Sequence, residues 1–245
     1  MPLAMFTGGA SWFVREASRN LIGDGWQVAL SDIDKEGAEA NAKEIGGDNV
    51  ASVDRLDVTD LDAVRAYADH LAEKHGGIDA LINVAGGTNY LKMQRLPLHE
   101  TDPQTWQRIL APNINGTINC CYAVIPHMIQ ARRGSIINLS SGMGLKGKPR
   151  MALYSFAKGG IVTFTHSLCQ ELAPYNIRVN AIAPGSAESR WMPELKPAET
   201  ASTVPPLGTR TSAKDVGDAI HFLISDKARH ITGICLDISG GSSLH

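Results

Sequence analysis

The sequence predicts an α/β protein, built as a single-domain Rossmann-type doubly wound parallel sheet with about seven strands and helices on both faces. Short apolar runs alternate with longer segments of helical periodicity almost from one end of the chain to the other. This alternation is typical of strand–helix–strand units, whose right-handed crossovers make neighbouring strands parallel. Glycine and polar residues follow most of the apolar runs, at the sheet edge where such folds bind ligands.

Each expected strand is a run of mainly apolar residues. The runs are 3–6, 27–31, 50–56, 80–83, 135–139, 178–183 and 234–238. The periodicity of the segments between them predicts helices over 13–22, 35–45, 60–75, 103–131, 153–173 and 213–225. Asp60 and Ser212 stand near the starts of two of these helices and are expected to be N-caps.

Pro112 lies inside the long helical segment 103–131. A proline within a helix removes one backbone hydrogen bond and clashes with the carbonyl one turn earlier, here that of Arg108. Two interpretations stay open. Either the break frees a carbonyl that binds water near the functional site, or it separates two shorter helices.

Composition and charge argue against several classes of function. Hydrophobic residues make up 43% of the 245 residues and charged residues 20%, which is ordinary for a globular protein. The net charge of −2 gives no reason to expect nucleic acid or an anionic membrane as partner. No run of 18 or more apolar residues is present, and the first residues do not resemble a signal peptide. The four cysteines lack disulfide or metal-ligand spacing, so we expect a cytoplasmic protein without a metal site.

We expect one domain over residues 1–245, because α/β folds of this length are often undivided. The only shift in composition is at 184–211, which is rich in Pro, Ser and Thr and poor in periodicity. A long irregular segment inside a compact domain is often a functional lid. Residues at about 186–210 are therefore expected to form a substrate flap.

Tyr154 and Lys158 are the residues most suggestive of chemistry. Four residues apart on a helix, they lie on one face, so their polar ends can share a site. A free phenol titrates near pH ~10, and an adjacent ammonium lowers that value. The pair is thus expected to be a tuned proton donor or acceptor, with the hydroxyl of Ser141 placed to hold a substrate oxygen. By itself this spacing also fits an ordinary exposed helix face.

Suggestive residues also stand after successive strands. Asp32 ends the second strand, 24 residues after Gly8, where a carboxylate can accept hydrogen bonds from ribose hydroxyls and repel a 2′-phosphate. The residues at the other strand ends are Gly8 after the first, Asp57 after the third, Asn83 to Gly86 at the fourth, Ser140 and Ser141 after the fifth, and Pro184 and Gly185 after the sixth. Each alone is also compatible with a helix cap or a turn. All of them at one sheet edge favour a ligand site.

At this point the chain resembles the short-chain dehydrogenase/reductase family over essentially its full length. The motifs that carry the resemblance are Asn83-Val84-Ala85-Gly86, Asn113 in Asn-Ile-Asn-Gly, Ser141, the Tyr154 and Lys158 pair, and Pro184-Gly185. The resemblance implies an NAD(H)-dependent oxidoreductase that interconverts a secondary alcohol and a ketone. It also implies a small-molecule substrate and a homotetramer or homodimer built on helices 103–131 and 153–173.

The resemblance further implies a role for each site residue. Tyr154 is the general acid/base, Ser141 binds the substrate oxygen, and Lys158 lowers the tyrosine pKa and holds the nicotinamide ribose. Asn113 supports a water that relays the proton, and Asp57 approaches the adenine. The implied cofactor-binding residues are Gly8, Ser11, Asp32, Asp57, Val58, Asn83, Ala85, Gly86, Tyr154, Lys158, Pro184 and Gly185.

The phosphate loop departs from the family pattern Thr-Gly-x-x-x-Gly-x-Gly. Trp12 and Val14 stand where the second and third glycines normally let the backbone approach the diphosphate and pack the first helix on the sheet. We therefore expect either an indole that points away from the phosphates or one that occupies their space. Val14 is expected to need compensating small residues. Two alternatives follow: a binding or regulatory protein that has lost the cofactor, or a non-redox lyase similar to halohydrin dehalogenases.

The substrate is expected to be a secondary alcohol or its ketone, selected by the loops after Gly86, by residues 142–151 and by the flap. Basic residues stand out in these loops: Lys92, Arg95, Lys146, Lys148, Arg150 and Arg190. They are either solvated surface cations or partners for a carboxylate or phosphate on the substrate.

Overall fold

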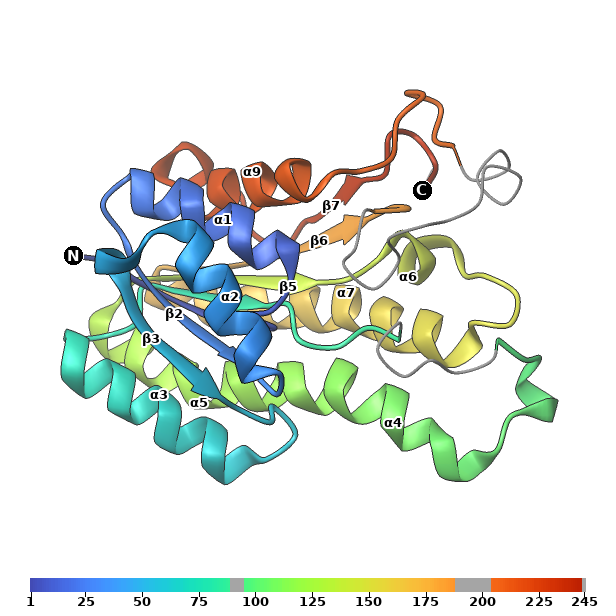
Figure 1. Cartoon of the computed structure of the whole chain (residues 1–245), viewed down its shortest axis with the longest axis horizontal. Helices are drawn as coiled ribbons and strands as arrows, with labels where there is room; N and C mark the ends of the chain where they lie inside the picture. The colour runs from blue at the N-terminus through green and yellow to red at the C-terminus, as the bar shows by residue number, and fades with distance from the viewer. Residues whose placement is uncertain (89–94, 188–203, 244–245) are drawn as a thin grey trace.

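Seven parallel strands form one sheet in the computed structural model, which describes residues 1–88, 95–187 and 204–243 (Figure 1). Their order is β3-β2-β1-β4-β5-β6-β7, with the reversal between β1 and β4 that defines a doubly wound sheet. The strands are β1 (Leu3–Thr7), β2 (Gln27–Asp32), β3 (Val50–Arg55), β4 (Ala80–Asn83), β5 (Gly134–Leu139), β6 (Ile177–Pro184) and β7 (Cys235–Ile238). The predicted fold class and all seven predicted strands are confirmed.

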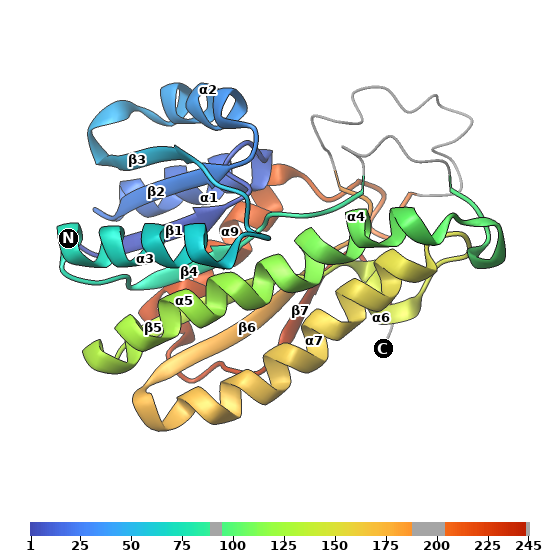
Figure 2. The same cartoon turned by 90° about the horizontal axis from the view of Figure 1, so that it is seen from below.

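Helices cover both faces of this sheet (Figures 1 and 2). On one face lie α1 (Trp12–Gly23), α2 (Lys35–Ile45) and α9 (Ala213–Ile224), and on the other α3 (Leu61–His75), α5 (Gly116–Ala131) and α7 (Ala152–Leu172). The side chains of β1 alternate between the two resulting cores: Leu3 and Met5 face α3 and α5, while Phe6 faces α1 and α9. Such burial on both faces explains why the strands are apolar runs in the sequence.

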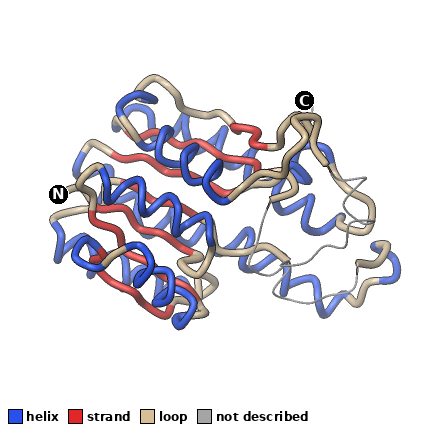
Figure 3. Tube along the Cα trace, turned by 45° about the horizontal axis from the view of Figure 1, so that its top comes forward, coloured by secondary structure: helices blue, strands red, loops and turns tan. Residues whose placement is uncertain are grey.

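The end of the sheet formed by the carboxyl ends of its strands carries the longer loops (Figure 3). The short helix α6 (Gly142–Lys146) is among the elements there and was not predicted. The predicted caps at Asp60 and Ser212 are confirmed, since their side chains accept hydrogen bonds from the backbone N–H groups of Ala63 and Asp215. Most of the expected flap, residues 188–203, lies outside the described residues. In the part of the chain that the structure describes, no helix has both the length and the apolarity needed to cross a membrane.

Pro112 neither ends a helix nor leaves a gap. The short helix α4 (Trp106–Leu110) continues through a π-helical turn (Ala111–Asn115) directly into α5. The side chain of Asn113 donates a hydrogen bond to the carbonyl of Ile109, 2.8 Å away, inside this turn. The proline is thus accommodated by a wider turn in a continuous helical path, so the interpretation that Pro112 separates two helices is wrong. The interpretation that a carbonyl here binds water stays a prediction.

Gly217 allows a close contact between α1 and α9. Val14 and Ala17 are fully buried, and a Cβ atom on Gly217 of α9 would lie 2.8 Å from the Cβ of Glu16. A glycine at this point in α9 therefore lets the two helices pack closely. This glycine faces Glu16 and Ala17, so the compensation expected for Val14 stays a prediction.

We predict that Gly217→Ala destabilises the protein by about 1–3 kcal/mol, because the added methyl group meets the backbone and side chain of α1. Gly23→Ala, at the end of α1 with nothing within 4 Å of the added atom, is the control and is expected to be neutral or slightly stabilising. Urea unfolding of both variants measures the difference. Equal stability of the two variants would show that the helices do not require this contact.

Candidate active site

A cavity of about 1760 Å³ lies at the carboxyl ends of the strands. It extends from Asp32 and Asp57, beyond β2 and β3, to Tyr154 and Lys158 on α7. Every sequence-predicted site residue except Asn83 and Asn113 lines it: Gly8, Ser11, Asp32, Asp57, Val58, Ala85, Gly86, Ser141, Tyr154, Lys158, Pro184 and Gly185. The topology therefore brings together residues that are up to 177 positions apart in the chain, from Gly8 to Gly185.

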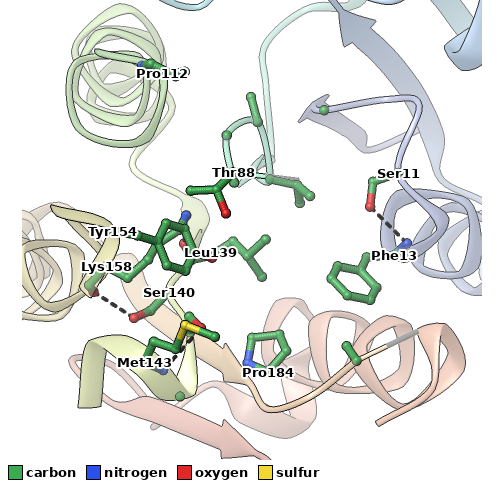
Figure 4. A pocket seen from close by; sticks show the side chains of 18 of the residues that line it. Ser11, Phe13, Thr88, Pro112, Leu139, Ser140, Met143, Tyr154, Lys158 and Pro184 are labelled. Carbon is green, nitrogen blue, oxygen red and sulfur yellow. Dashed lines mark hydrogen bonds between the residues drawn. The ribbon is translucent and has the colours of Figure 1, made fainter. Parts of the chain in front are cut away.

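Tyr154 and Lys158 lie on successive turns of α7 and face the same cavity (Figure 4). The Nζ atom of Lys158 lies 5.9 Å from the centroid of the Tyr154 ring and donates a hydrogen bond to the carbonyl of Leu139, 2.8 Å away. In return, the hydroxyl of Ser140 donates to the carbonyl of Lys158 at 2.7 Å. These two bonds tie the end of β5 to α7 and fix the lysine beneath the tyrosine.

Ser141 lies at the N-terminus of α6. Its hydroxyl accepts a hydrogen bond from the backbone N–H of Met143 as the N-cap of that helix. Gly144 lets α6 lie directly on α7, since a Cβ atom there would be 2.6 Å from the carbonyl carbon of Lys158. The close contact positions the serine hydroxyl beside Tyr154, to which it is hydrogen-bonded.

Burial sets the protonation of the pair. The pKa of Tyr154 is raised by desolvation, and the hydrogen bond with Ser141 only partly offsets this. The pKa of Lys158, which is 2% exposed, is lowered to about 7 by burial. The expected lowering of the tyrosine pKa by Lys158 is therefore wrong for the chain alone. The ammonium is itself disfavoured by burial, and its N–H group is directed to Leu139.

Asn113 is completely buried and does not line the cavity. Its amide oxygen accepts from the N–H of Gly87 at 2.8 Å, and its amide nitrogen donates to the carbonyl of Gly87 at 3.0 Å. Its own carbonyl accepts from the hydroxyl of Thr117. Asn113 thus positions the loop after β4, where Gly86 has a φ of 124° and no room for a side chain. The water-binding role implied by the family finds no support in this arrangement.

Asn83 is likewise buried, and its side chain is hydrogen-bonded within the core. Its amide nitrogen donates to the amide oxygen of Asn138 at 2.9 Å, and Asn138 donates in turn to the hydroxyl of Thr165 at 3.0 Å. This buried chain of side chains connects β4, β5 and α7. The side chain of Asn83 does not line the cavity, whereas Val84 and Ala85 do. That Asn83 takes part in binding the cofactor stays a prediction.

The opposite end of the cavity is built on the loop after β1. Gly8 has a φ of 71°, and a Cβ atom there would lie 2.8 Å from the backbone nitrogen of Ala85. The two oxygens of Asp32 accept hydrogen bonds from the N–H groups of Ala10 and Asp34, both at 2.9 Å. The two hydrogen bonds therefore fix the carboxylate at the cavity wall.

Trp12 lines the cavity but does not divide it. Its indole lies against the guanidinium of Arg15, 5.8 Å from the ring centroid, and Arg15 also pairs with Glu16 and Glu44. The cavity continues past Trp12 from Asp32 to Tyr154. The hydroxyl of Ser11 caps α1 by accepting from the N–H of Phe13, whose ring points into the cavity (Figure 4).

Sequence reasoning missed part of the cavity wall. Gly241, Ser242 and Ser243 after β7 line it and were not predicted. Met143 and Met151, which also line it, lie in the segment 142–151 that was expected to select the substrate. The glycine pair Gly240-Gly241 follows β7 in the same way as Gly8 follows β1 and Gly185 follows β6. Inspecting the residues after the last predicted strand, as was done for the other strands, would have found this segment. The basic residues Arg95, Lys146 and Lys148 also line the cavity, whereas Lys92 and Arg190 lie outside the described residues.

Comparison with known proteins agrees with this geometry. A family model described as enoyl-(acyl carrier protein) reductase matches residues 14–243. The 3-oxoacyl-[acyl-carrier-protein] reductase of Thermotoga maritima is 35% identical over 98% of this chain and 96% of its own length. The cis-4-hydroxycyclohexanecarboxylate dehydrogenase of Sinomonas cyclohexanicum is also 35% identical, over 98% and 95%.

Solved structures give the same result. The 3-ketoacyl-(acyl-carrier-protein) reductase from Brucella melitensis, complexed with NADH, superposes with a TM-score of 0.90 at 29% identity, covering 99% of this chain and 98% of its own. Levodione reductase superposes with a TM-score of 0.90 at 26% identity, covering 98% and 96%. The chain therefore belongs to the short-chain dehydrogenase/reductase family, a family of oxidoreductases that use a nicotinamide cofactor.

The lowered pKa of Lys158 makes stability depend on pH. The folded chain loses the ammonium proton near pH 7, whereas the unfolded chain keeps it up to about 10.5. We predict that the wild type gains stability relative to Lys158→Met as the pH rises above 7, by up to roughly 1.4 kcal/mol per pH unit, because the unfolded state then binds the extra proton. Urea unfolding of both proteins at about pH 6, 7.5 and 9 tests this. A difference that stays constant would mean that Lys158 remains charged when folded.

Proposed function

We propose that this protein interconverts a secondary alcohol and a ketone by NAD(H)-dependent hydride transfer, with Tyr154 as the general acid/base. The observation that carries the proposal is the continuity of one cavity, which joins the carboxylate of Asp32 to the hydroxyls of Ser141 and Tyr154. A dinucleotide is a ligand long enough to use both ends.

The residues present fit a dinucleotide. Asp32 is placed to accept the hydroxyls of a ribose, and Asp57 and Val58 border the space expected for the adenine. Gly8 and the N-terminal turn of α1 provide a backbone surface for phosphates. When bound, the cofactor supplies or accepts the hydride, and the protein supplies binding, orientation and the proton. The negative charge of Asp32 favours NAD(H) over NADP(H), whose 2′-phosphate it would repel.

Ser141 and Tyr154 provide the proton chemistry. A substrate carbonyl between them accepts hydrogen bonds from both hydroxyls, so that the developing oxyanion is stabilised as hydride reaches the carbon. The tyrosine proton then passes to that oxygen and yields the alcohol. Because burial raises the Tyr154 pKa, the phenol is protonated at neutral pH and is ready for ketone reduction. In the oxidative direction the phenolate is needed, and a charged Lys158 beneath the ring stabilises it.

The other candidate functions differ in what they require. A cofactor-free binding protein or a halohydrin-dehalogenase-like lyase has no need for the fixed carboxylate of Asp32, and Trp12 leaves the cavity continuous. An enoyl reductase, named by the matching family description, uses the same cofactor on a carbon–carbon double bond. An absorbance assay with NADH and a panel of ketones, diones and enoyl thioesters distinguishes these reactions.

Assembly and location belong to the same proposal. We propose a homotetramer, or else a homodimer, and a cytoplasmic protein. Ile118 and Tyr122 on α5 and Phe156 on α7 are exposed apolar residues available for such a contact. By contrast, Ile161, Phe164 and Leu168 on α7 are buried or packed on the core. The four cysteines are free thiols, as is usual inside cells.

Tyr154→Phe is expected to lower kcat by roughly 10²–10⁴-fold, because it removes the proton donor and leaves the ring in place. NADH binding, followed by tryptophan fluorescence, is expected to be unchanged. Tyr175→Phe, at the far end of α7, is the control and is expected to keep full activity. Near-normal turnover by Tyr154→Phe would rule out the general acid/base role.

Asp32→Ala is expected to reduce the preference for NADH over NADPH by roughly 10-fold or more, since it removes a like charge beside the 2′-position. The ratio of kcat/KM for the two cofactors is the measurement. Asp57→Asn is the control, because it alters a carboxylate in the same cavity without facing that position and is expected to affect both cofactors alike. An unchanged ratio in Asp32→Ala would remove Asp32 from the cofactor site.

A further inference from the structure

Charge is segregated along the cavity. The carboxylates that line it are Asp32, Asp34 and Asp57, all at the end formed by β2 and β3. The cations that line it, apart from the buried Lys158, are Arg95, Arg108, Lys146 and Lys148. Summed charges of one sign in a cleft raise the local concentration of oppositely charged ligands.

The cations belong to the walls around Tyr154. Arg108 lies on α4, Lys146 is the last residue of α6, and Lys148 follows in the loop that leads to α7. These helices meet at one end of the molecule, away from α2 and β3, where the described carboxylates of the cavity lie (Figure 2). The positive end of the cavity is therefore the substrate end, beyond the position expected for the nicotinamide.

Lys146 is oriented by the segment after β7. Its ammonium donates a hydrogen bond to the carbonyl of Ser242, which leaves two further N–H groups on the same nitrogen. The attachment holds an otherwise flexible side chain at the cavity wall, beside a residue that also lines the cavity. A lysine held in this way loses less conformational freedom on binding a ligand than a free one.

Ser243 supplies a second polar group at this place. It is 5% exposed and lines the cavity, and its hydroxyl oxygen is buried without a hydrogen-bond partner among the described residues. A Cβ atom on Gly142 would lie 2.7 Å from this oxygen, so the hydroxyl is directly beside α6. A buried hydroxyl without a partner is costly unless a ligand or water satisfies it.

The space between these polar groups and Tyr154 is apolar. Met143 and Met151 line it from α6 and from the start of α7, and Val204 and Pro206 line it from the loop before α9. Such side chains suit a hydrocarbon body rather than a polyhydroxylated one. The substrate end thus has an apolar middle, a proton donor on one side and a positive, hydroxyl-bearing wall on another.

We propose that the substrate is an oxo or hydroxy compound with a hydrocarbon body and an anionic oxygen group away from the reacting carbon. Lys146 and Ser243 bind that group directly, and the other cations attract it. This inference rests on the proposed function, which it makes specific for a substrate class. The anionic group is a carboxylate of a small acid or a phosphate of a larger thioester, and the two sources are separated by experiment.

The experiment compares four probes in the presence of NADH: 4-oxocyclohexanecarboxylate, its methyl ester, acetoacetyl-coenzyme A, and neutral cyclohexanone. Binding is followed by calorimetry and turnover by NADH absorbance. The wild type is expected to bind the acid or the thioester at least 10-fold more tightly than the ester and cyclohexanone. Preference for the acid identifies a carboxylate, and preference for the thioester a phosphate.

Variants of Lys146 and Ser243 test whether these residues contact the anionic group. Lys146→Met is expected to raise the KM for the preferred anionic probe by roughly 10-fold or more, with little change in kcat or in NADH affinity. Lys146→Arg is expected to restore much of the binding, and Ser243→Ala to weaken it by a smaller factor. Lys214→Met, an exposed lysine on α9 outside the cavity, is the control with unchanged kinetics.

The outcomes separate the two proposals. If no anionic probe binds better than its neutral counterparts, or if Lys146→Met and Ser243→Ala leave its KM unchanged, the anionic-substrate inference is overturned while hydride transfer stands. If the anionic probe binds through Lys146 but no ketone is reduced, the inference holds and the proposed reaction fails. A loss of NADH affinity in Lys146→Met would assign this cation to the cofactor and also overturn the inference.

Discussion

The hydrogen bond from Lys158 to the carbonyl of Leu139 is the contact on which the site depends. It joins the last residue of β5 to the second turn of α7, and the bond from Ser140 back to the carbonyl of Lys158 closes the link. A buried amine is costly, and here its cost is offset by a lowered pKa and by a fixed partner. The position of the tyrosine above it follows from helical geometry alone.

A second constraint acts beneath the site. The chain of side chains from Asn83 through Asn138 to Thr165 runs across β4 and β5 into α7 at the level where the strands end. Buried polar networks of this kind specify one arrangement of neighbouring elements, because a shifted arrangement would leave several groups unpaired. Asn113 acts similarly between α5 and the loop after β4. Two asparagines that resemble ligands in the sequence therefore work as supports.

The sequence predicted the strands, most of the helices and the edge of the sheet at which the cavity lies, because burial on both sheet faces leaves a clear apolar pattern. It did not predict which side chains face the core and which face the cavity. Asn83 and Ala85 stand two residues apart, and only the three-dimensional arrangement shows that one faces the core and the other the cavity. The raised pKa of Tyr154 could not be foreseen from its spacing to Lys158, since it is caused by desolvation, which the hydrogen bond with Ser141 only partly offsets. The short helix α6 is too brief and too rich in glycine to leave a periodic signal.

The two hydrogen bonds that Asp32 accepts bear on how coenzyme choice can change in this protein. One oxygen holds the turn after β1 and the other the turn that leads into α2, so the carboxylate serves as an internal brace as well as a selective charge. Replacing it by a residue that accommodates a phosphorylated ribose leaves the backbone N–H groups of Ala10 and Asp34 without their acceptors. A switch of coenzyme, in evolution or in the laboratory, therefore calls for a coordinated set of substitutions in both turns.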